Sequence, residues 1–166
     1  MARKSAKTPD EAAALRNPRL RPQVVGNGGL YFAAYKLSKM GWNVMPTSRN
    51  ARGVDILAYD TRAQEYLGIQ VKALSKRNNV PLGRSIDRDR FMGHWWIIVI
   101  KIATDKPECF IMRPDEVRRR ATRTKKAAVP WYYLRPTCYD TDKFSDAWDR
   151  IGPPPVQPRR VKRNFP

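Results

Sequence analysis

Cysteine and histidine are almost absent from this sequence. Only two cysteines, Cys109 and Cys138, and one histidine, His94, occur among its 166 residues. A disulfide framework is therefore excluded, and so is a zinc site of ordinary composition, which takes four ligands drawn mainly from cysteine and histidine. We expect both cysteines to have a structural role only.

Long apolar segments are also missing. The longest apolar run, from Trp95 to Ile100, is far too short to cross a bilayer, for which about 20 residues are needed. The first residues are basic, but no apolar segment follows them as one does in a secretory signal. The sequence therefore predicts an intracellular protein without a membrane span.

Acidic residues are few compared with basic ones. The chain has 15 Asp and Glu against 33 Lys and Arg, which gives a formal net charge of +18. So much charge of one sign indicates a polyanionic partner, with nucleic acid as the first candidate and an anionic membrane surface as the second. Hydrophobic residues still make up 42% of the chain, which excludes full disorder and a plain coiled coil.

Composition divides the chain into an arm, one folded domain and a tail. Residues 1–22 form a basic N-terminal arm in which one or two helical turns are expected. Residues 153–166 are rich in proline and arginine and contain no acid, which predicts an extended C-terminal tail. The folded domain is expected over residues 23–152, and it contains no internal repeat.

Hydrophobic periodicity predicts an α/β order for that domain. Residues 26–29 are predicted to be a glycine-rich turn before a helix from Leu30 to Met40, which Gly41 ends. Strands are expected over 42–46, 54–59, 66–73, 94–102, 108–112 and 129–134, with a long basic loop over 75–93. Helices are expected over 114–120 and 142–151. The predicted fold class is therefore α/β, with a mixed sheet and flanking helices.

Three polar residues interrupt strands that are otherwise apolar. Asp55 and Gln70 each lie between two apolar neighbours, and Lys72 shares a strand face with Gln70. If the hairpin is symmetric about the bond between residues 62 and 63, Asp55 lies opposite Gln70. A carboxylate, an amide and an ammonium group then come together. The plainer alternative is a cross-strand Asp–Lys ion pair on a hydrated sheet face.

These groups suit metal-assisted hydrolysis of a phosphodiester. Asp55, the side-chain oxygen of Gln70 and the carbonyl of Val71 can hold a hard divalent ion through oxygen, together with water. Such an ion polarises a scissile phosphate and lowers the pKa of a bound water. Lys72 can orient that water or stabilise the charge that develops on the phosphate. Asp55, Gln70 and Lys72 are therefore the candidate catalytic residues.

The order of these residues resembles the PD-(D/E)XK nuclease superfamily. Asp55 lies in the first strand of a hairpin, Gln70-Val71-Lys72 in the second, and a helix and a Gly41-Trp42 strand precede them, so the match covers about residues 26–102. The chain looks most like small single-domain members related to archaeal Holliday-junction resolvases. The resemblance implies a restriction-endonuclease-like mixed sheet with flanking helices. It also implies a DNA endonuclease that uses Mg²⁺ or Mn²⁺, and it is compatible with a homodimer.

Two positions depart from the family pattern. Glu is commoner where this chain has Gln70, and related members usually place a metal-binding Glu where it has Leu30. Asp55 would be the only strong anionic ligand, so metal should bind weakly unless Asp10 or Glu11 folds back to the site. We expect the Leu30 side chain to face the Asp55 cluster. The departures keep a second interpretation open: a catalytically weak or inactive nuclease-fold protein that binds nucleic acid.

Basic residues outside the hairpin are candidates for contacts with a nucleic-acid backbone. One group follows Lys72 in the loop, and another holds seven bases between Arg113 and Lys126. The candidates are Arg77, Arg84, Arg88, Arg118, Arg119, Arg120 and Arg123. His94 is expected to be structural, and at most one of the adjacent tryptophans can stack on a base, because they point to opposite faces. A basic RNA-associated protein is a third alternative, although no RRM or KH signature is present.

Overall fold

The computed structural model describes residues 20–47, 53–88, 91–124 and 129–155. Asp10, Glu11 and most of the predicted arm and tail lie outside these residues. The elements, in order, are α2 (Pro22–Lys39), β1 (Asn43–Pro46), β2 (Ile56–Tyr59), β3 (Tyr66–Ala73), β4 (Val80–Gly83), β5 (Trp95–Ile100), β6 (Glu108–Met112), α3 (Pro114–Arg120), β7 (Thr122–Arg123), β8 (Tyr132–Leu134), α4 (Pro136–Tyr139) and a 3-10 helix (Trp148–Arg150). No helix in this part of the chain is both long and apolar enough to cross a membrane.

A five-stranded mixed sheet organises the domain and confirms the predicted α/β class. Its strand order is β1-β2-β3-β5-β6, with β3 and β5 parallel and the other neighbours antiparallel. A separate three-stranded sheet, in the order β4-β8-β7, was not expected from the sequence. The prediction of a long basic loop over 75–93 is wrong at β4, because the buried Val80 pairs there with the buried Leu134.

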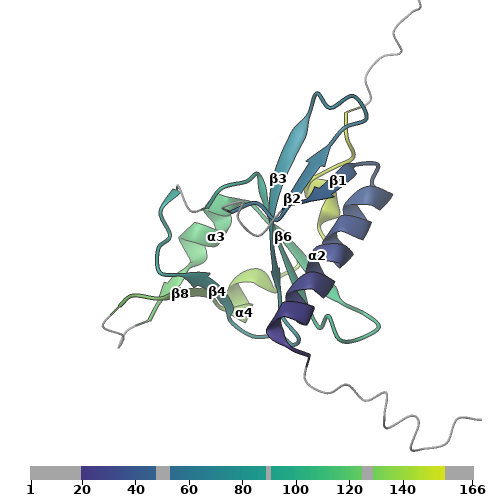
Figure 1. Ribbon diagram of the computed structural model, residues 1–166. Helices are drawn as coiled ribbons and strands as arrows, with labels where there is room; N and C mark the ends of the chain where they lie inside the picture. Colours follow the sequence, from purple (N-terminus) through teal and green to yellow (C-terminus); the bar gives the residue numbers. More distant parts are fainter. Residues whose placement is uncertain (1–19, 48–52, 89–90, 125–128, 156–166) are drawn as a thin grey trace, which may run out of the picture.

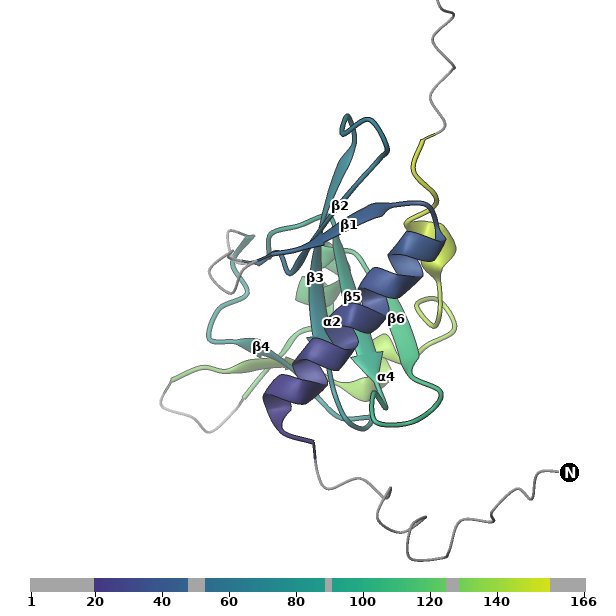
Figure 2. The same cartoon turned by 45° about the vertical axis from the view of Figure 1, so that its right-hand side comes forward.

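Helix α2 covers one face of the large sheet, and α3, α4 and the small sheet lie on the other (Figure 1). Figure 2 shows α2 lying across the strands. Ala33 and Leu37 of α2 pack in one core cluster with residues such as Ile69, while the opposite cluster includes Ile98. Every residue of β5 is buried, as its continuous apolar sequence predicts for an interior strand.

Glycine residues inside α2 serve close packing, so the predicted turn over 26–29 is wrong. The helix begins at Pro22 and runs through all three glycines. A Cβ on Gly29 would lie 2.3 Å from the Cβ of Ala73, and a Cβ on Gly28 would lie 3.0 Å from Cγ1 of Ile102. The missing side chains therefore let the helix approach the end of β3 closely, which outweighs the low helix propensity of glycine. Gly41, with a φ of +97°, follows the helix as expected.

The predicted helix over 142–151 is also wrong. The backbone of this segment instead extends the edge of β6: Ile111 N–H donates to the Phe144 carbonyl, and Ser145 bridges to Phe110. The segment thereby passes around the sheet edge. Phe144 packs in the core opposite α2, whereas Trp148 and Ile151 pack in the core beneath α2. Their helical spacing thus reflects burial on two different faces.

Candidate functional site

The β2–β3 hairpin has the register that the sequence predicts. Ile56 lies opposite Ile69, and Tyr59 lies opposite Tyr66. Continued by one residue, this register places Asp55 opposite Gln70, and the Asp55 N–H donates to the Ile69 carbonyl at 2.8 Å. The predicted juxtaposition of Asp55 and Gln70 is therefore confirmed.

The Asp55 carboxylate fills the position where the β2–β3 ladder ends. Its Oδ2 accepts the backbone N–H of Val71 at 2.7 Å and a hydrogen bond from the Gln70 side-chain amide. Asp55 is half-buried and Gln70 is buried. β2 begins at Ile56 and so has no residue opposite Val71. The Asp55 carboxylate therefore accepts the Val71 N–H in place of a strand partner, and this hydrogen bond fixes the carboxylate against β3.

Lys72 lies on the same face of β3 as Gln70, two residues further along. Its ammonium group is 5.7 Å from the centroid of the Trp96 ring, and the residue is half-buried. Among the described residues Lys72 forms no ion pair within 4 Å. The alternative of a cross-strand Asp–Lys ion pair is therefore not what the structure shows, and the Lys72 charge has no anionic partner in this part of the chain.

Leu30 does not face this cluster, contrary to expectation. It packs against the core beneath α2, which includes Ile56 and Ile69. Side chains alternate along a strand, so Gln70 and its cross-strand partner Asp55 lie on the opposite face of the sheet. The first turn of α2 also contains no acid. Leu30 thus packs with the hydrophobic core on the α2 face and leaves the Asp55 cluster on the other face.

The donor set suits a hard divalent ion with few protein ligands. Among the described residues, no group of three or more His, Cys, Asp and Glu could hold a metal. Asp55 is the anionic donor, and Val71 offers a carbonyl. The Gln70 amide nitrogen faces Asp55; a half-turn of the amide would present its oxygen instead. These residues fit Mg²⁺ or Mn²⁺ only with water as the main ligand, and a low ligand charge predicts weak binding.

Three glycines bring the segments around this site into close contact. A Cβ on Gly93 would lie 2.9 Å from the Gly68 carbonyl oxygen, and a Cβ on Gly53 would lie 3.0 Å from the Met92 Cβ. Gly93 and Gly53 also have positive φ angles, of +91° and +72°. The loop before Asp55, the middle of β3 and the segment before β5 therefore form one packed unit.

His94 has the structural role expected of it. Its side-chain Nδ1 accepts the backbone N–H of Gly68 at 2.9 Å, and the backbone N–H of His94 donates to the Gly68 carbonyl at 2.6 Å. Trp95 and Trp96 point to opposite faces as predicted, but both are buried. Neither is therefore available to stack on a base.

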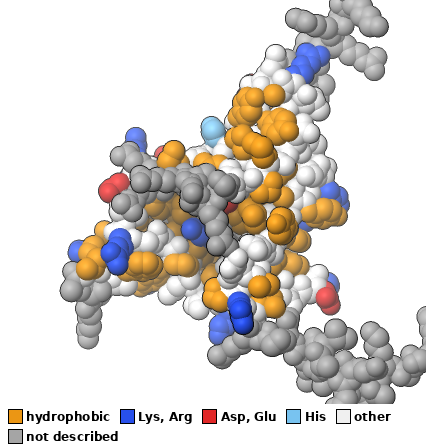
Figure 3. Space-filling view, in the orientation of Figure 1, with side chains coloured by type: hydrophobic (Ala, Val, Ile, Leu, Met, Phe, Trp, Pro, Cys, Tyr) orange, Lys and Arg blue, Asp and Glu red, His pale blue; other side chains and the backbone are white. Residues whose placement is uncertain are grey.

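The candidate basic residues differ in whether their side chains bind other groups of the protein or are exposed to solvent. Arg77 forms an ion pair with Asp140, and this hydrogen bond raises the pKa of Arg77. Arg120 donates to the Glu116 carbonyl at 3.2 Å. Arg84, Arg119 and Arg123 are exposed, and Arg88 is exposed beside Arg118 at a pocket. Figure 3 shows basic side chains in several separate parts of this face, not in one patch.

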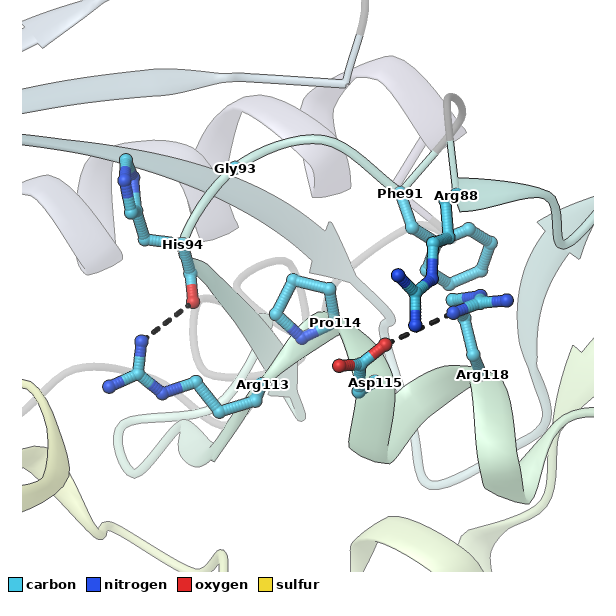
Figure 4. Close-up of a pocket in the computed structure, with 8 residues that line it drawn as sticks. All are labelled: Arg88, Phe91, Gly93, His94, Arg113, Pro114, Asp115 and Arg118. Carbon is cyan, nitrogen blue, oxygen red and sulfur yellow. Dashed lines mark hydrogen bonds and ion pairs between the residues drawn. The ribbon is translucent and has the colours of Figure 1, made fainter.

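That pocket, of about 430 Å³, opens between the segment before β5 and the start of α3 (Figure 4). Its lining is Arg88, Phe91, Gly93, His94, Arg113, Pro114, Asp115 and Arg118. The sequence identifies both arginine groups, but nothing in it shows that they converge. Phe91 is buried there, and its place in the pocket cannot be predicted from the sequence, because an isolated Phe in a basic segment belongs to no hydrophobic periodicity.

Comparison with known proteins gives one distant structural similarity. No protein-family model and no curated protein matches the sequence. The fold is similar to that of a bacterial homing endonuclease, I-Ssp6803I, with a TM-score of 0.47 and 15% identity over 78% of this chain and 91% of the other. Similarity this distant says nothing about function, which depends on the side chains themselves.

Proposed function

We propose that this protein is a metal-dependent nuclease that hydrolyses phosphodiesters in DNA. The observation that carries the proposal is the meeting of Asp55 with Gln70 at the end of the β2–β3 ladder. Lys72, which forms no ion pair with the described residues, lies on the same face of β3. A carboxylate and a lysine so placed, on a chain of net charge +18, suit a negatively charged phosphodiester. The resemblance of Asp55 and Gln70-Val71-Lys72 to the PD-(D/E)XK pattern adds support.

In this proposal each residue has a separate role. Asp55, with the Gln70 side-chain oxygen and the Val71 carbonyl, would hold Mg²⁺ or Mn²⁺, and the ion would supply Lewis acidity. Lys72 donates to a phosphoryl oxygen and stabilises the negative charge that develops there. Water oxygen adds to phosphorus and gives up a proton to solvent, one P–O ester bond breaks, and the leaving oxygen takes a proton from solvent. The products are a phosphomonoester on one fragment and a hydroxyl on the other. The face of the Trp96 ring lies beneath the Lys72 ammonium and attracts it, which helps to hold the side chain in place.

Cleavage of supercoiled plasmid and of branched DNA with Mg²⁺ or Mn²⁺ tests the proposal. We expect Lys72→Ala to lower kcat by roughly 10²–10³-fold, the usual effect of removing one donor that stabilises a transition state. DNA affinity should change far less. Lys76→Ala is the matched control, since it removes the same charge from an exposed position four residues further on. Equal cleavage by the Lys72 and Lys76 variants would show that Lys72 is not catalytic.

A second candidate function is nucleic-acid binding without cleavage. The observation that favours it is the poor donor set: Leu30 packs against the core, and the described residues hold no group of three or more His, Cys, Asp and Glu that could bind a metal. This function predicts tight, salt-sensitive DNA binding and no cleavage with either metal. A shallow dependence of affinity on salt would contradict both candidates.

A further inference from the structure

We propose that the pocket between the segment before β5 and the start of α3 binds a second phosphate of the nucleic-acid strand. This inference rests on the proposed function, and it concerns a phosphate other than the one at Lys72. The pocket is about 430 Å³ in volume, which leaves room for a phosphate and its sugar. Its apolar surface comes from Phe91 and Pro114, and its rim is basic.

The Phe91 side of the pocket and the Asp55 site lie on the same side of the sheet, whereas the Arg113 guanidinium lies against Trp95, whose ring packs on the face covered by α2. The Phe91 ring stacks on Trp96 with centroids 4.8 Å apart, and the Lys72 ammonium lies 5.7 Å from the same Trp96 ring. Trp96 is also the parallel partner of Gln70. Asp55 and Trp96 therefore lie about two strand spacings apart, roughly 10 Å, and the pocket begins at the Phe91 ring that stacks on Trp96. One strand of nucleic acid can pass over both.

Basic groups lie on two sides of the pocket. Figure 4 shows His94 and Arg113 on one side and Arg88, Asp115 and Arg118 on the other, with Pro114 between them. Arg118 donates to the Asp115 carboxylate at 3.0 Å and to the Ile86 carbonyl at 2.9 Å. The one carboxylate of the lining is thus neutralised by an arginine that is itself fixed in place.

Arg88 and Arg113 remain to bind an anion. Arg88 is exposed and forms no ion pair with any described residue. The Arg113 guanidinium stacks at 3.5 Å on the Trp95 ring, and with the described residues its N–H groups make a single hydrogen bond, of 3.4 Å, to the His94 carbonyl. Stacking holds the planar group while its other donors stay available, and such a fork suits two phosphate oxygens.

Fluorescence anisotropy of a labelled DNA duplex in EDTA, measured over a series of salt concentrations, tests the pocket. We expect Arg88→Gln/Arg113→Gln to weaken binding and to reduce the slope of log affinity against log salt by about 0.9, the value for one lost phosphate contact. Asp115→Asn should strengthen binding, because it removes a negative charge and releases Arg118. Lys106→Gln is the matched control, on the exposed turn at the far end of β5. Arg88→Gln alone keeps the test valid if loss of the Trp95 stack destabilises the double variant.

Two further measurements separate this inference from the nuclease proposal. In cleavage assays Arg88→Gln should raise KM, whereas Lys72→Ala lowers kcat. If the wild type does not cut DNA but the pocket variants bind DNA more weakly than the wild type, the pocket is upheld and the nuclease proposal is wrong. If the wild type cuts DNA but the pocket variants have the same DNA affinity as the Lys106→Gln control, the pocket inference is wrong and the nuclease proposal stands. Calorimetric binding of inorganic phosphate that depends on Arg88, with unaltered DNA binding, would assign the pocket to a small anion and also overturn it.

Discussion

The Oδ2 atom of Asp55 accepts the backbone N–H of Val71 at 2.7 Å, so the carboxylate is attached to the strand that carries Lys72. The same oxygen accepts the Gln70 amide. With the described residues the other oxygen, Oδ1, forms no hydrogen bond, and the side chain is half-buried. One carboxylate oxygen is thus structural, and the other is free to meet an ion or water.

A second carboxylate beside Asp55 should strengthen metal binding. Gln70→Glu keeps the shape of the side chain and adds one negative charge, and ligand charge count tunes the affinity of such sites over orders of magnitude. We expect Mn²⁺ to bind at least about tenfold more tightly, measured by titration calorimetry. In EDTA the two carboxylates repel each other, so the variant should have a lower Tm than the wild type, and Mn²⁺ should restore it.

The control for this prediction is Gln23→Glu, which adds the same charge at an exposed position in the first turn of α2. It should leave Mn²⁺ affinity at the wild-type value. Equal Mn²⁺ affinities for Gln70→Glu and Gln23→Glu would mean that no cation binds beside Asp55.

Removal of the Asp55 charge should separate metal binding from DNA binding. Asp55→Asn retains an oxygen that can accept the Val71 N–H, so the hairpin should keep its fold. We expect Mn²⁺ binding and metal-dependent cleavage to be lost, while DNA affinity in EDTA stays equal or rises because a negative charge is gone. Anisotropy in EDTA, together with cleavage in Mn²⁺, measures both effects. Undiminished cleavage by this variant would exclude Asp55 as a metal ligand.

The juxtaposition of Asp55 and Gln70 could be predicted from the sequence because it depends on short-range relationships. A symmetric hairpin turn determines which residues face each other, and strand alternation determines which share a face. Asp55 and Gln70 meet for these reasons alone. The convergence of Arg88 with Arg118 could not be predicted in this way, because it depends on how the segment before β5 packs against α3.

The errors in the predicted fold arise where tertiary contacts outweigh local preference. Glycines at 28 and 29 favour a turn by composition, but at this place they allow α2 to lie against Ala73 and Ile102. The spacing of Phe144 and Trp148 favours a helix, but the backbone between them bonds to the edge of β6. Local sequence patterns do not show which distant segment a residue packs against in the fold.

The closeness of α2 to β3 makes Gly29 sensitive to substitution. Gly29→Ala would place a Cβ 2.3 Å from the Ala73 Cβ, and this overpacking should reduce the free energy of unfolding by about 1–3 kcal/mol. Gly26→Ala is the matched control on the same helix, since a Cβ there meets nothing within 4 Å. It should stabilise the protein by up to about 1 kcal/mol through helix propensity. Urea unfolding of the two variants checks both values, and a neutral Gly29→Ala would show that α2 lies further from the sheet.

Glu116 is a buried carboxylate that joins α3 to the end of the domain. Its oxygens accept the Arg113 N–H at 2.8 Å and bind Arg150 at 2.9 Å and Lys143 at 2.9 Å. Burial opposes ionisation of Glu116, but these three partners outweigh it and lower its pKa to about 2. The charged form is therefore favoured in the folded protein.

This depressed pKa predicts how stability depends on pH. The contribution of Glu116 is fully present above its unfolded pKa, near 4.5, and is lost as the pH falls towards its folded pKa of about 2. The difference corresponds to about 3 kcal/mol. Glu116→Gln should therefore lower the free energy of unfolding at pH 7 and flatten its decline between about pH 5 and pH 2, measured by urea unfolding at a series of pH values. Glu108→Gln, at a half-exposed pair with Lys101, should leave that decline as it is in the wild type. If the two variants decline alike, Glu116 is not the group whose protonation destabilises the domain in acid.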